Sequence, residues 1–426
     1  MISILIWIGL LLIIVFGVPI AFSMGVGSII MLLLDGKVNI VVIAQRAING
    51  VDSYTLLAIP FFIVAAQIMS ETGIGEKIFD FANSLVSPIP GGLGQVNVFD
   101  SVIHSGMSGS CVTDLTGMGK LEIDAMVKAG YDRPFSSAVS ATSCLLGAIF
   151  PPSISMVLYS AATGVSLGGL LLAGIVPGVL MTLAMGVVVF IISKRRNYPT
   201  YPRAPLKELA VNFVKCIPCL LMPLILMGSI LGGIMTPTEA ACTAVIYAII
   251  LGTLLYRNLS FKNFFRILEK SIDLICSIML IISAAAILGL VLTQQQIPQK
   301  MIGFFIGISN NPLVVVLIIN LVLLVIGTVM ETTSMFMIMG PILGALAIKL
   351  GVDPVHFGMM VVYNFNLALV TPPVGMVLFL TCKVGQITSA EFVREMWPFL
   401  GSLVVVLLLI IFIPQLSVFI PNLFLK

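Results

Sequence analysis

Two double prolines, Pro151 with Pro152 and Pro372 with Pro373, stand in the middle of apolar stretches of the chain. Proline has no backbone N–H and its ring clashes with the preceding helical turn, so a double proline breaks a helix and leaves carbonyl oxygens unpaired. In a membrane, such a break persists only where it faces protein or a water-filled cavity. Free carbonyl and hydroxyl oxygens at a break are ligands for Na⁺, while the N-termini of half-helices attract an anionic substrate.

A polar, glycine-rich segment accompanies each break, at residues 104–114 and 327–334. Each segment is predicted to form a helical hairpin that enters the membrane and turns back, with its tip near the midplane and beside its own proline break. A structural role is the alternative, because membrane helices use Ser, Thr and Gly for close packing and prolines also make kinks without a ligand. Two matched breaks with two matched hairpins favour a pair of related binding sites.

Acidic side chains lie in both predicted hairpins. Asp114 is in the first and Glu331 is in the second. Ionisable groups within a membrane are functional candidates, but a helix cap or a solvated hairpin base explains each of them equally well. Both interpretations stay open at the level of the sequence.

The remaining conspicuous polar residues have mainly structural interpretations. Asp132 and Asp353 are predicted to cap the helices that follow them. His104 and His356 have no metal-like neighbours in the sequence and are predicted to be satisfied structural residues. Arg46 either attracts an acid or anchors the chain at the membrane interface.

The composition excludes several classes of protein. The chain of 426 residues is 59% hydrophobic and only 9% charged, whereas a soluble protein carries about 25% charged residues. A net charge of +3 over this length makes no basic patch for nucleic acid. Because Gly119 and Lys120 are followed by Leu121, there is no phosphate-binding P-loop. The sequence also lacks an H-E-x-x-H motif and so does not indicate a zinc-dependent enzyme.

Long stretches without Asp, Glu, Lys or Arg predict a polytopic, all-α membrane protein. About 20 apolar residues span a bilayer as a helix, and about ten such crossings fit this chain. Residues 403–413 are continuously apolar, whereas the strands of a membrane barrel alternate apolar and polar residues. The charge-free stretches are 1–34, 53–70, 81–99, 134–193, 216–238, 274–299, 301–330, 354–382 and 396–425.

An internal duplication relates the two halves of the chain. Pro151 and Pro372 are 221 residues apart (372 − 151 = 221), and three further pairs share this offset: Gly106 with Gly327, Gly130 with Gly351, and Pro177 with Pro398. Four landmarks in one register indicate a repeat. The predicted repeats are 1–193, with a hairpin at about 98–123, and 216–426, with a hairpin at about 320–345; a basic linker, 194–215, joins them. Five crossings per repeat is an odd number, so the second repeat is predicted to be inverted.

The basic side chains predict the orientation. With the N-terminus outside the cell, 16 of the 21 Lys and Arg residues, including those of the linker, fall on the inner side. Positive charge on the cytoplasmic side is the usual arrangement in membrane proteins.

Eight short segments of the sequence form a specific set. They are PFF (60–62), GGL (91–93), SGS (108–110), AGYD (129–132), PPS (151–153), TPTEA (236–240), DPVHFG (353–358) and TPPVG (371–375). With this set the chain resembles the large membrane subunit of the tripartite ATP-independent periplasmic (TRAP) transporters of bacteria, and the resemblance covers essentially the whole chain.

This resemblance implies a sodium-driven importer of organic acids in the bacterial inner membrane, with a periplasmic N-terminus and an elevator mechanism that uses a scaffold and a moving domain. It also implies two partners, a small four-helix membrane subunit and a soluble periplasmic binding protein. Sialic acid is the favoured substrate and a C4-dicarboxylate the next. The alternatives are a Na⁺/carboxylate symporter that works without a binding protein, a channel, and an intramembrane enzyme.

The resemblance also implies at least two Na⁺ sites. The first combines Ser105, Ser108 and Ser110 with carbonyls near Gly147, Ile149 and Pro151. The second combines Gly327 and Thr328 with Thr371 and Pro372. Asp114, Glu331 and Ser108 are expected to support these sites or to couple them to the substrate.

Overall fold

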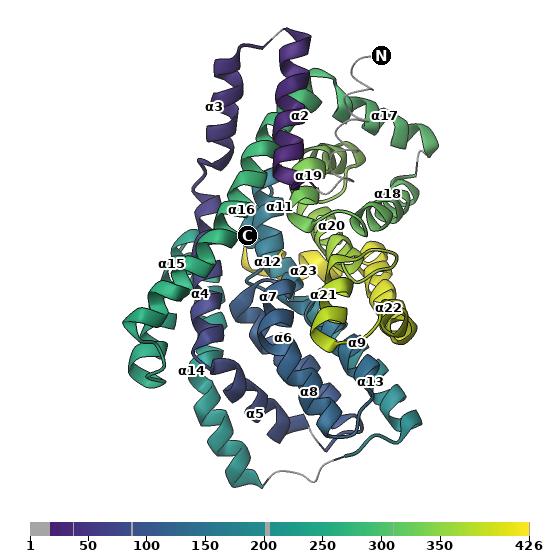
Figure 1. Ribbon diagram of the computed structural model, residues 1–426. Helices are drawn as coiled ribbons and strands as arrows, with labels where there is room; N and C mark the ends of the chain where they lie inside the picture. The colour runs from purple at the N-terminus through teal and green to yellow at the C-terminus, as the bar shows by residue number, and fades with distance from the viewer. Residues whose placement is uncertain (1–17, 37, 87, 201–204, 310, 426) are drawn as a thin grey trace.

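The computed structural model describes residues 18–36, 38–86, 88–200, 205–309 and 311–425. Within these ranges, all regular structure is helical (Figure 1). The beginning of the first predicted crossing, residues 1–17, lies outside the described residues, as do 201–204 of the linker. The all-α class predicted from the sequence is confirmed for the described part of the chain.

The helices of the first half alternate between long segments and short ones that interrupt them. Their bounds are α2 Ile20–Asp35, α3 Ile40–Val51, η1 Thr55–Leu57, α4 Ala58–Glu71, α5 Ile74–Val86, α6 Gly92–Ser108, α7 Cys111–Asp114, η2 Leu115–Gly119, α8 Lys120–Lys128, α9 Arg133–Ser143, α10 Leu146–Ile149, α11 Ile154–Thr163, α12 Leu167–Ala173 and α13 Ile175–Arg196.

The helices of the second half include the longest one, α16. Their bounds are α14 Leu206–Leu231, α15 Pro237–Ile250, η3 Leu251–Leu255, α16 Phe261–Gln294, α17 Ile297–Ile308, α18 Pro312–Gly327, α19 Thr332–Leu350, α20 Pro354–Ala368, α21 Met376–Gly385, α22 Ser389–Phe412 and α23 Gln415–Phe424.

By length and composition, six described helices can cross a membrane, or eight if each of two bent pairs counts as one span. The bent pairs join 40–51 to 55–71 at 55° and 133–149 to 154–163 at 45°. The sequence predicts about ten crossings. The described helices supply fewer by this measure because α2, α18, α21 and α23 are apolar but each is shorter than 18 residues.

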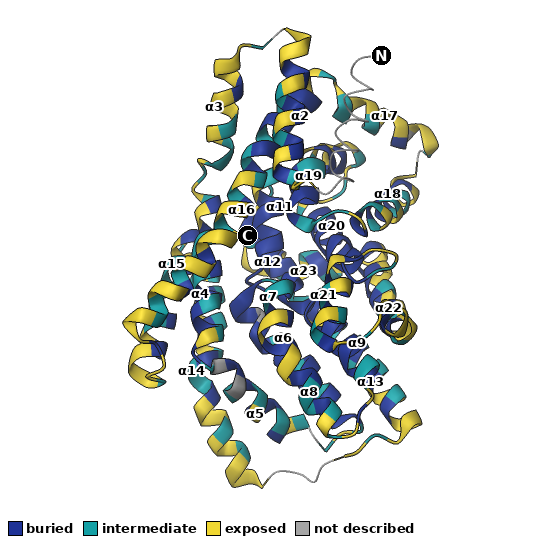
Figure 2. Cartoon of the chain, in the orientation of Figure 1, coloured by how far each residue is buried: buried dark blue, intermediate teal, exposed yellow. Residues whose placement is uncertain are grey.

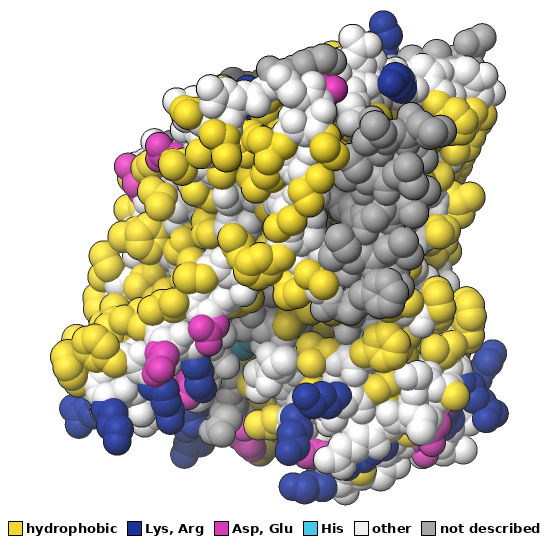
Figure 3. Space-filling model, turned by 45° about the horizontal axis from the view of Figure 1, so that its top comes forward, with side chains coloured by type: hydrophobic (Ala, Val, Ile, Leu, Met, Phe, Trp, Pro, Cys, Tyr) yellow, Lys and Arg dark blue, Asp and Glu magenta, His cyan; other side chains and the backbone are white. Residues whose placement is uncertain are grey.

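The outer surface matches a lipid environment. Figure 3 shows a broad band of hydrophobic side chains on one face, with Lys and Arg side chains gathered along its lower edge. Large apolar side chains such as Leu183, Leu224 and Leu321 are more than 60% exposed. The buried residues concentrate at the centre, in α9, α11 and α20 (Figure 2).

Local sequence signals explain where several helices begin. Thr236 and Glu239 form a capping box at the start of α15, with Pro237 in its first turn. Asp353 accepts hydrogen bonds from the Val355 and His356 amides at 2.9 and 3.0 Å, so its predicted role as a cap is confirmed.

The predicted capping role of Asp132 is wrong. Its side chain makes no capping hydrogen bond to α9. Instead, it pairs with the Arg196 guanidinium at 3.2 Å and accepts a hydrogen bond from the Tyr198 hydroxyl. Arg196 also binds the Glu395 carboxylate through two hydrogen bonds, at 2.8 and 3.0 Å, and thereby joins the end of α13 to α22. The Arg196 guanidinium is a charged donor and binds a carboxylate strongly, which directs the Asp132 side chain to Arg196 and Tyr198 and away from the α9 amides.

Two helical hairpins approach the centre from opposite ends of the molecule. The first has α6 as one arm and α7, η2 and α8 as the other, and its arms extend beyond the predicted interval 98–123. The second consists of α18 and α19 and extends beyond 320–345. In Figure 1, α6 and α8 lie in the lower half of the view, and α18 and α19 lie in the upper half.

A separate group of helices lies beside the hairpins. α16 packs along α2 and α3, and α4 packs on α15. In Figure 1, α3, α4 and α15 lie on the left side and α2 stands at the top near the middle, whereas α9, α13, α21 and α22 lie toward the right. α16 also contacts α19, so the two groups meet along this helix.

Candidate functional site

The first double proline separates α10 from α11. Phe150 leaves the helix in an extended conformation, and the peptide bond between Pro151 and Pro152 is cis. Ser153 begins α11 by accepting a hydrogen bond from the Met156 amide at 3.3 Å. The helix is therefore interrupted at the predicted position.

The tip of the first hairpin lies directly against this break. The Ile154 amide donates a hydrogen bond to the Gly109 carbonyl at 3.0 Å. Gly109 has φ +62°, and an added Cβ would lie 2.9 Å from the Pro152 carbonyl oxygen. An added Cβ on Gly147 would lie 3.2 Å from the backbone of Ser110. Glycine at both positions lets the two backbones touch.

The second half repeats this contact. The peptide bond between Pro372 and Pro373 is cis, and the Gly375 amide donates a hydrogen bond to the Thr328 carbonyl at 2.9 Å. Gly375 and Ile154 are 221 residues apart (375 − 154 = 221), which is the offset of the sequence repeat. We call these two hydrogen bonds the tip-to-break bonds.

The predicted ligands of the first site are only partly brought together. Ser108 is 1% exposed, and its hydroxyl has no hydrogen-bond partner among the described residues. Ser110 lies against Gly147, as described above. The Ile149 carbonyl oxygen would lie 2.3 Å from a Cβ on Gly174. This carbonyl therefore faces the start of α13 and does not face the hairpin.

Two further predicted residues complete the first set. The Pro151 carbonyl oxygen would lie 4.0 Å from a Cβ on Gly106, so it faces the α6 arm of the hairpin. Ser105 also belongs to α6, but its side chain is outside the described part of the structure.

The predicted residues of the second site lie in one place. The Thr328 hydroxyl donates to the Val325 carbonyl at 2.9 Å, and the Thr371 hydroxyl donates to the Leu367 carbonyl at 2.8 Å. A hydroxyl that donates its hydrogen keeps its oxygen lone pairs as acceptors or ligands. Gly327 packs closely on α20, where an added Cβ would lie 2.5 Å from the Ala368 methyl group. Pro372 directly follows Thr371 in the break.

The two hairpin acids have different surroundings. Glu331 accepts hydrogen bonds from the Thr333 and Ser334 amides at 2.9 and 3.0 Å, so the structure shows it as the cap of α19. Asp114 is 3% exposed, and its Oδ2 has no hydrogen-bond partner among the described residues. Its Oδ1 lies 3.7 Å from His104 Nε2.

The two histidines also differ. His356 Nδ1 forms a 2.6 Å hydrogen bond with the Ser417 hydroxyl, so its predicted structural role is confirmed. The same prediction for His104 is wrong, because neither ring nitrogen has a hydrogen-bond partner among the described residues. Asp114 at 3.7 Å is too far for a hydrogen bond.

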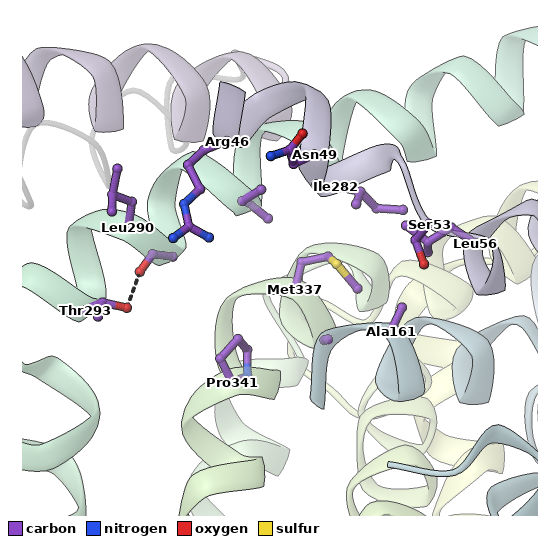
Figure 4. A pocket seen from close by; sticks show the side chains of 15 residues that line it. Arg46, Asn49, Ser53, Leu56, Ala161, Ile282, Leu290, Thr293, Met337 and Pro341 are labelled. Atoms are coloured by element: carbon purple, nitrogen blue, oxygen red, sulfur yellow. Dashed lines mark hydrogen bonds between the residues drawn. The ribbon is translucent and has the colours of Figure 1, made fainter. Parts of the chain in front are cut away.

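A cavity of about 480 Å³ lies where the two groups of helices meet (Figure 4). Arg46 is the charged side chain of its lining, and polar groups come from Asn49, Ser53 and Thr293. Figure 4 shows Arg46 on one wall, with Met337 and Pro341 of α19 across from it. The sequence named Arg46 as a residue that could attract an acid, but it did not predict the cavity, because its walls come from α3, α11, α16 and α19, which are far apart along the chain.

Comparison with known proteins identifies similar sequences over nearly the whole chain. The family model described as "Tripartite ATP-independent periplasmic transporter, DctM component" matches residues 7–416. The sialic acid TRAP transporter large permease protein SiaM of Vibrio cholerae is 39% identical over 98% of this chain and 97% of that protein. The C4-dicarboxylate TRAP transporter large permease protein DctM of Pseudomonas aeruginosa is 35% identical over 94% of both.

Two more comparisons extend this similarity. The sialic acid TRAP transporter permease protein SiaT of Haemophilus influenzae is 34% identical over 99% of this chain and 68% of that protein. Among solved structures, the YdaH transporter of Alcanivorax borkumensis has a TM-score of 0.61 over 87% of this chain and 88% of that one. At 14% sequence identity this last similarity concerns the fold alone.

Gly109→Ala is expected to destabilise the protein, because Ala in a left-handed conformation costs about 1–2 kcal/mol and the new methyl group presses on the Pro152 carbonyl. Gly401→Ala is the matched control. Nothing lies within 4 Å of a Cβ added there, in α22, so this change is expected to be neutral or stabilising. Thermal unfolding of the purified variants measures the difference, and equal melting temperatures would contradict the close contact at Gly109.

Proposed function

The chain belongs to the DctM component family of the tripartite ATP-independent periplasmic transporters and is a large permease, and from this premise we propose that it imports organic acids coupled to Na⁺. Its relatives are transport permeases and not enzymes. The observation that carries the proposal is the pair of tip-to-break bonds, at 3.0 and 2.9 Å, which hold each hairpin tip against a broken helix. The proposal includes at least two Na⁺ sites, one at each contact.

The chemistry of the two contacts suits an alkali cation. Carbonyl and hydroxyl oxygens at unwound helices are the usual Na⁺ ligands in secondary transporters. Ser108 offers a buried hydroxyl without a partner at the first contact. Thr328 and Thr371 offer hydroxyl oxygens whose hydrogens are already donated at the second. Within the described residues, no group of three or more His, Cys, Asp or Glu side chains is arranged to hold a metal ion.

We assign the cavity beside Arg46 to the organic acid. Its volume of about 480 Å³ lies within the range of small-molecule sites, about 300–1,000 Å³. A guanidinium binds a carboxylate through two parallel hydrogen bonds. Sialic acid is the favoured substrate because the similar proteins SiaM and SiaT carry this name, and a C4-dicarboxylate is the next candidate because of DctM.

The elevator mechanism is part of the proposal. In it, α2–α4 and α14–α16 form the scaffold, while the hairpins and broken helices move. The cavity lies between α3 and α16 on one side and α11 and α19 on the other, which is where such a movement would carry a substrate. The two hairpins approach from opposite ends, and the donors of the two tip-to-break bonds, Ile154 and Gly375, are 221 residues apart, as expected for inverted repeats at 1–193 and 216–426 joined by the linker 194–215.

The proposed assembly includes two partners and one orientation. A small four-helix membrane subunit and a periplasmic binding protein would complete the transporter in the bacterial inner membrane. The N-terminus would be periplasmic, because this places 16 of 21 basic residues on the cytoplasmic side. The lower edge of Figure 3, where Lys and Arg gather, would then be cytoplasmic.

Ser108→Ala and Thr371→Ala are each expected to raise the Na⁺ concentration for half-maximal uptake by about tenfold, which corresponds to about 1.4 kcal/mol. Uptake into proteoliposomes containing the small subunit and the binding protein measures this. Ser277→Ala is the control, because its hydroxyl also donates to a helix carbonyl but lies on an exposed face of α16. An unchanged Na⁺ response in both test variants would contradict the two sites. Omitting the binding protein tests the alternative symporter, which would retain full uptake.

Arg46→Gln is expected to raise KM for the organic acid several-fold, because the carboxylate of the substrate loses its charged partner. The Na⁺ dependence is expected to stay close to that of the unmodified protein. Lys349→Gln, at a basic residue outside the cavity, is the control. An unchanged KM in Arg46→Gln would contradict the assignment of the organic acid to this cavity.

Lys207→Cys and Lys349→Cys, in a background whose native cysteines are replaced, are expected to react with a membrane-impermeant thiol reagent from opposite sides. Position 207 lies in the basic linker 194–215, at the start of α14, and position 349 lies in the last turn of α19. In intact cells, only position 349 should react. Labelling of position 207 from outside would reverse the proposed orientation.

A further inference from the structure

The two arms of the first hairpin carry carboxyl groups that face each other. Asp100 belongs to α6 and is 0% exposed, and Glu122 belongs to α8 and is 3% exposed. The two side chains lie within hydrogen-bonding range of each other. This pair is outside both proposed Na⁺ sites and outside the cavity beside Arg46.

These carboxyl groups lack donors. Neither oxygen of Asp100, nor Oε1 of Glu122, has a hydrogen-bond donor among the described residues. Ionised carboxylates only accept hydrogen bonds, so two of them in contact repel. A single proton turns the same contact into a hydrogen bond between a carboxylic acid and a carboxylate.

The neighbouring polar groups direct their hydrogens elsewhere. The Ser143 hydroxyl donates to Asn97 Oδ1 at 2.7 Å, Asn97 Nδ2 donates to the Ser140 hydroxyl at 2.6 Å, and Ser140 donates to Glu122 Oε2 at 3.4 Å. This chain of hydrogen bonds ends on Glu122 and supplies no hydrogen to Asp100. The hydrogen between the two carboxyl groups must therefore be one of their own.

The ionisable surroundings do not compensate a second negative charge. The groups that interact with the pair are the carboxyl of Asp114 in α7, the thiol of Cys144 directly after α9 and the thiol of Cys216 in α14. Cys111 and His104 face Asp114. Among the described ion pairs, none joins these carboxyl groups to Lys or Arg.

The position of the pair favours a proton over a metal ion. The described residues include no group of three or more His, Cys, Asp or Glu side chains that could hold a metal. Two carboxyl groups in direct contact leave room for a hydrogen atom between their oxygens.

We propose that the first hairpin binds one proton, shared by the carboxyl groups of Asp100 and Glu122, and that this proton holds its two arms together. The shared hydrogen bond ties α6 to α8 about two turns below the tip that contacts the break. Loss of the proton would place two like charges across the hairpin and push the arms apart. The proton is thus a positioning element for the tip residues 108–110.

Infrared difference spectra of the full chain in lipid test this without measuring transport, so their result is independent of the proposed function. The variants are Asp100→Asn, Glu122→Gln and the double variant. Each single variant is expected to lose the C=O band of one protonated carboxyl group, because the new amide donates to the remaining carboxyl, which then stays ionised. The double variant is expected to lose one protonated and one ionised carboxyl group.

Asp80→Asn is the matched control, because Asp80 is exposed on α5 and should lose an ionised carboxylate only. If Asp100→Asn does not fold, Glu122→Gln alone gives the same answer. Loss of two ionised or two protonated carboxyl groups in the double variant would overturn the proposal, as would single variants that keep the protonated band.

Discussion

Inside a membrane, every backbone polar group needs a hydrogen-bond partner, and this structure depends on that constraint. A double proline removes helical hydrogen bonds in the middle of an apolar region. Here each break is closed by a hairpin tip from the same half of the chain, through the amide two residues after the second proline. The tip and the break are therefore one structural unit, and any oxygen that remains unpaired there is held in a fixed place.

Much of this unit was predictable from the sequence. Prolines and glycines act through the backbone of their own segment, so the breaks at Pro151 and Pro372 and the two turning points could be placed from spacing alone. Side-chain partners were less predictable. Asp132 pairs with Arg196, 64 residues away, and the Ile149 carbonyl faces Gly174. Only the three-dimensional packing of separate helices decides such contacts. The cavity beside Arg46 was missed for the same reason.

The two hairpins share a plan but differ in their acidic groups. The Glu331 carboxylate accepts hydrogen bonds locally, since it caps the helix of its own hairpin. The first hairpin instead buries Asp100, Asp114 and Glu122 in its interior. A buried charge without a partner is costly in free energy. The first hairpin is therefore the part of the molecule in which proton binding and cation binding can influence each other. The second hairpin has no such group among its described residues.

The central claim is that a cation occupies each contact between a hairpin tip and its proline break. High-resolution cryo-electron microscopy of the assembled transporter, in Na⁺ and in a bulky organic cation, tests it most directly. The account predicts density in Na⁺ between residues 108–110 and the first break and between Thr328 and Thr371 at the second, with both densities absent without Na⁺. Continuous helices at either double proline, or empty contacts in saturating Na⁺, would contradict it.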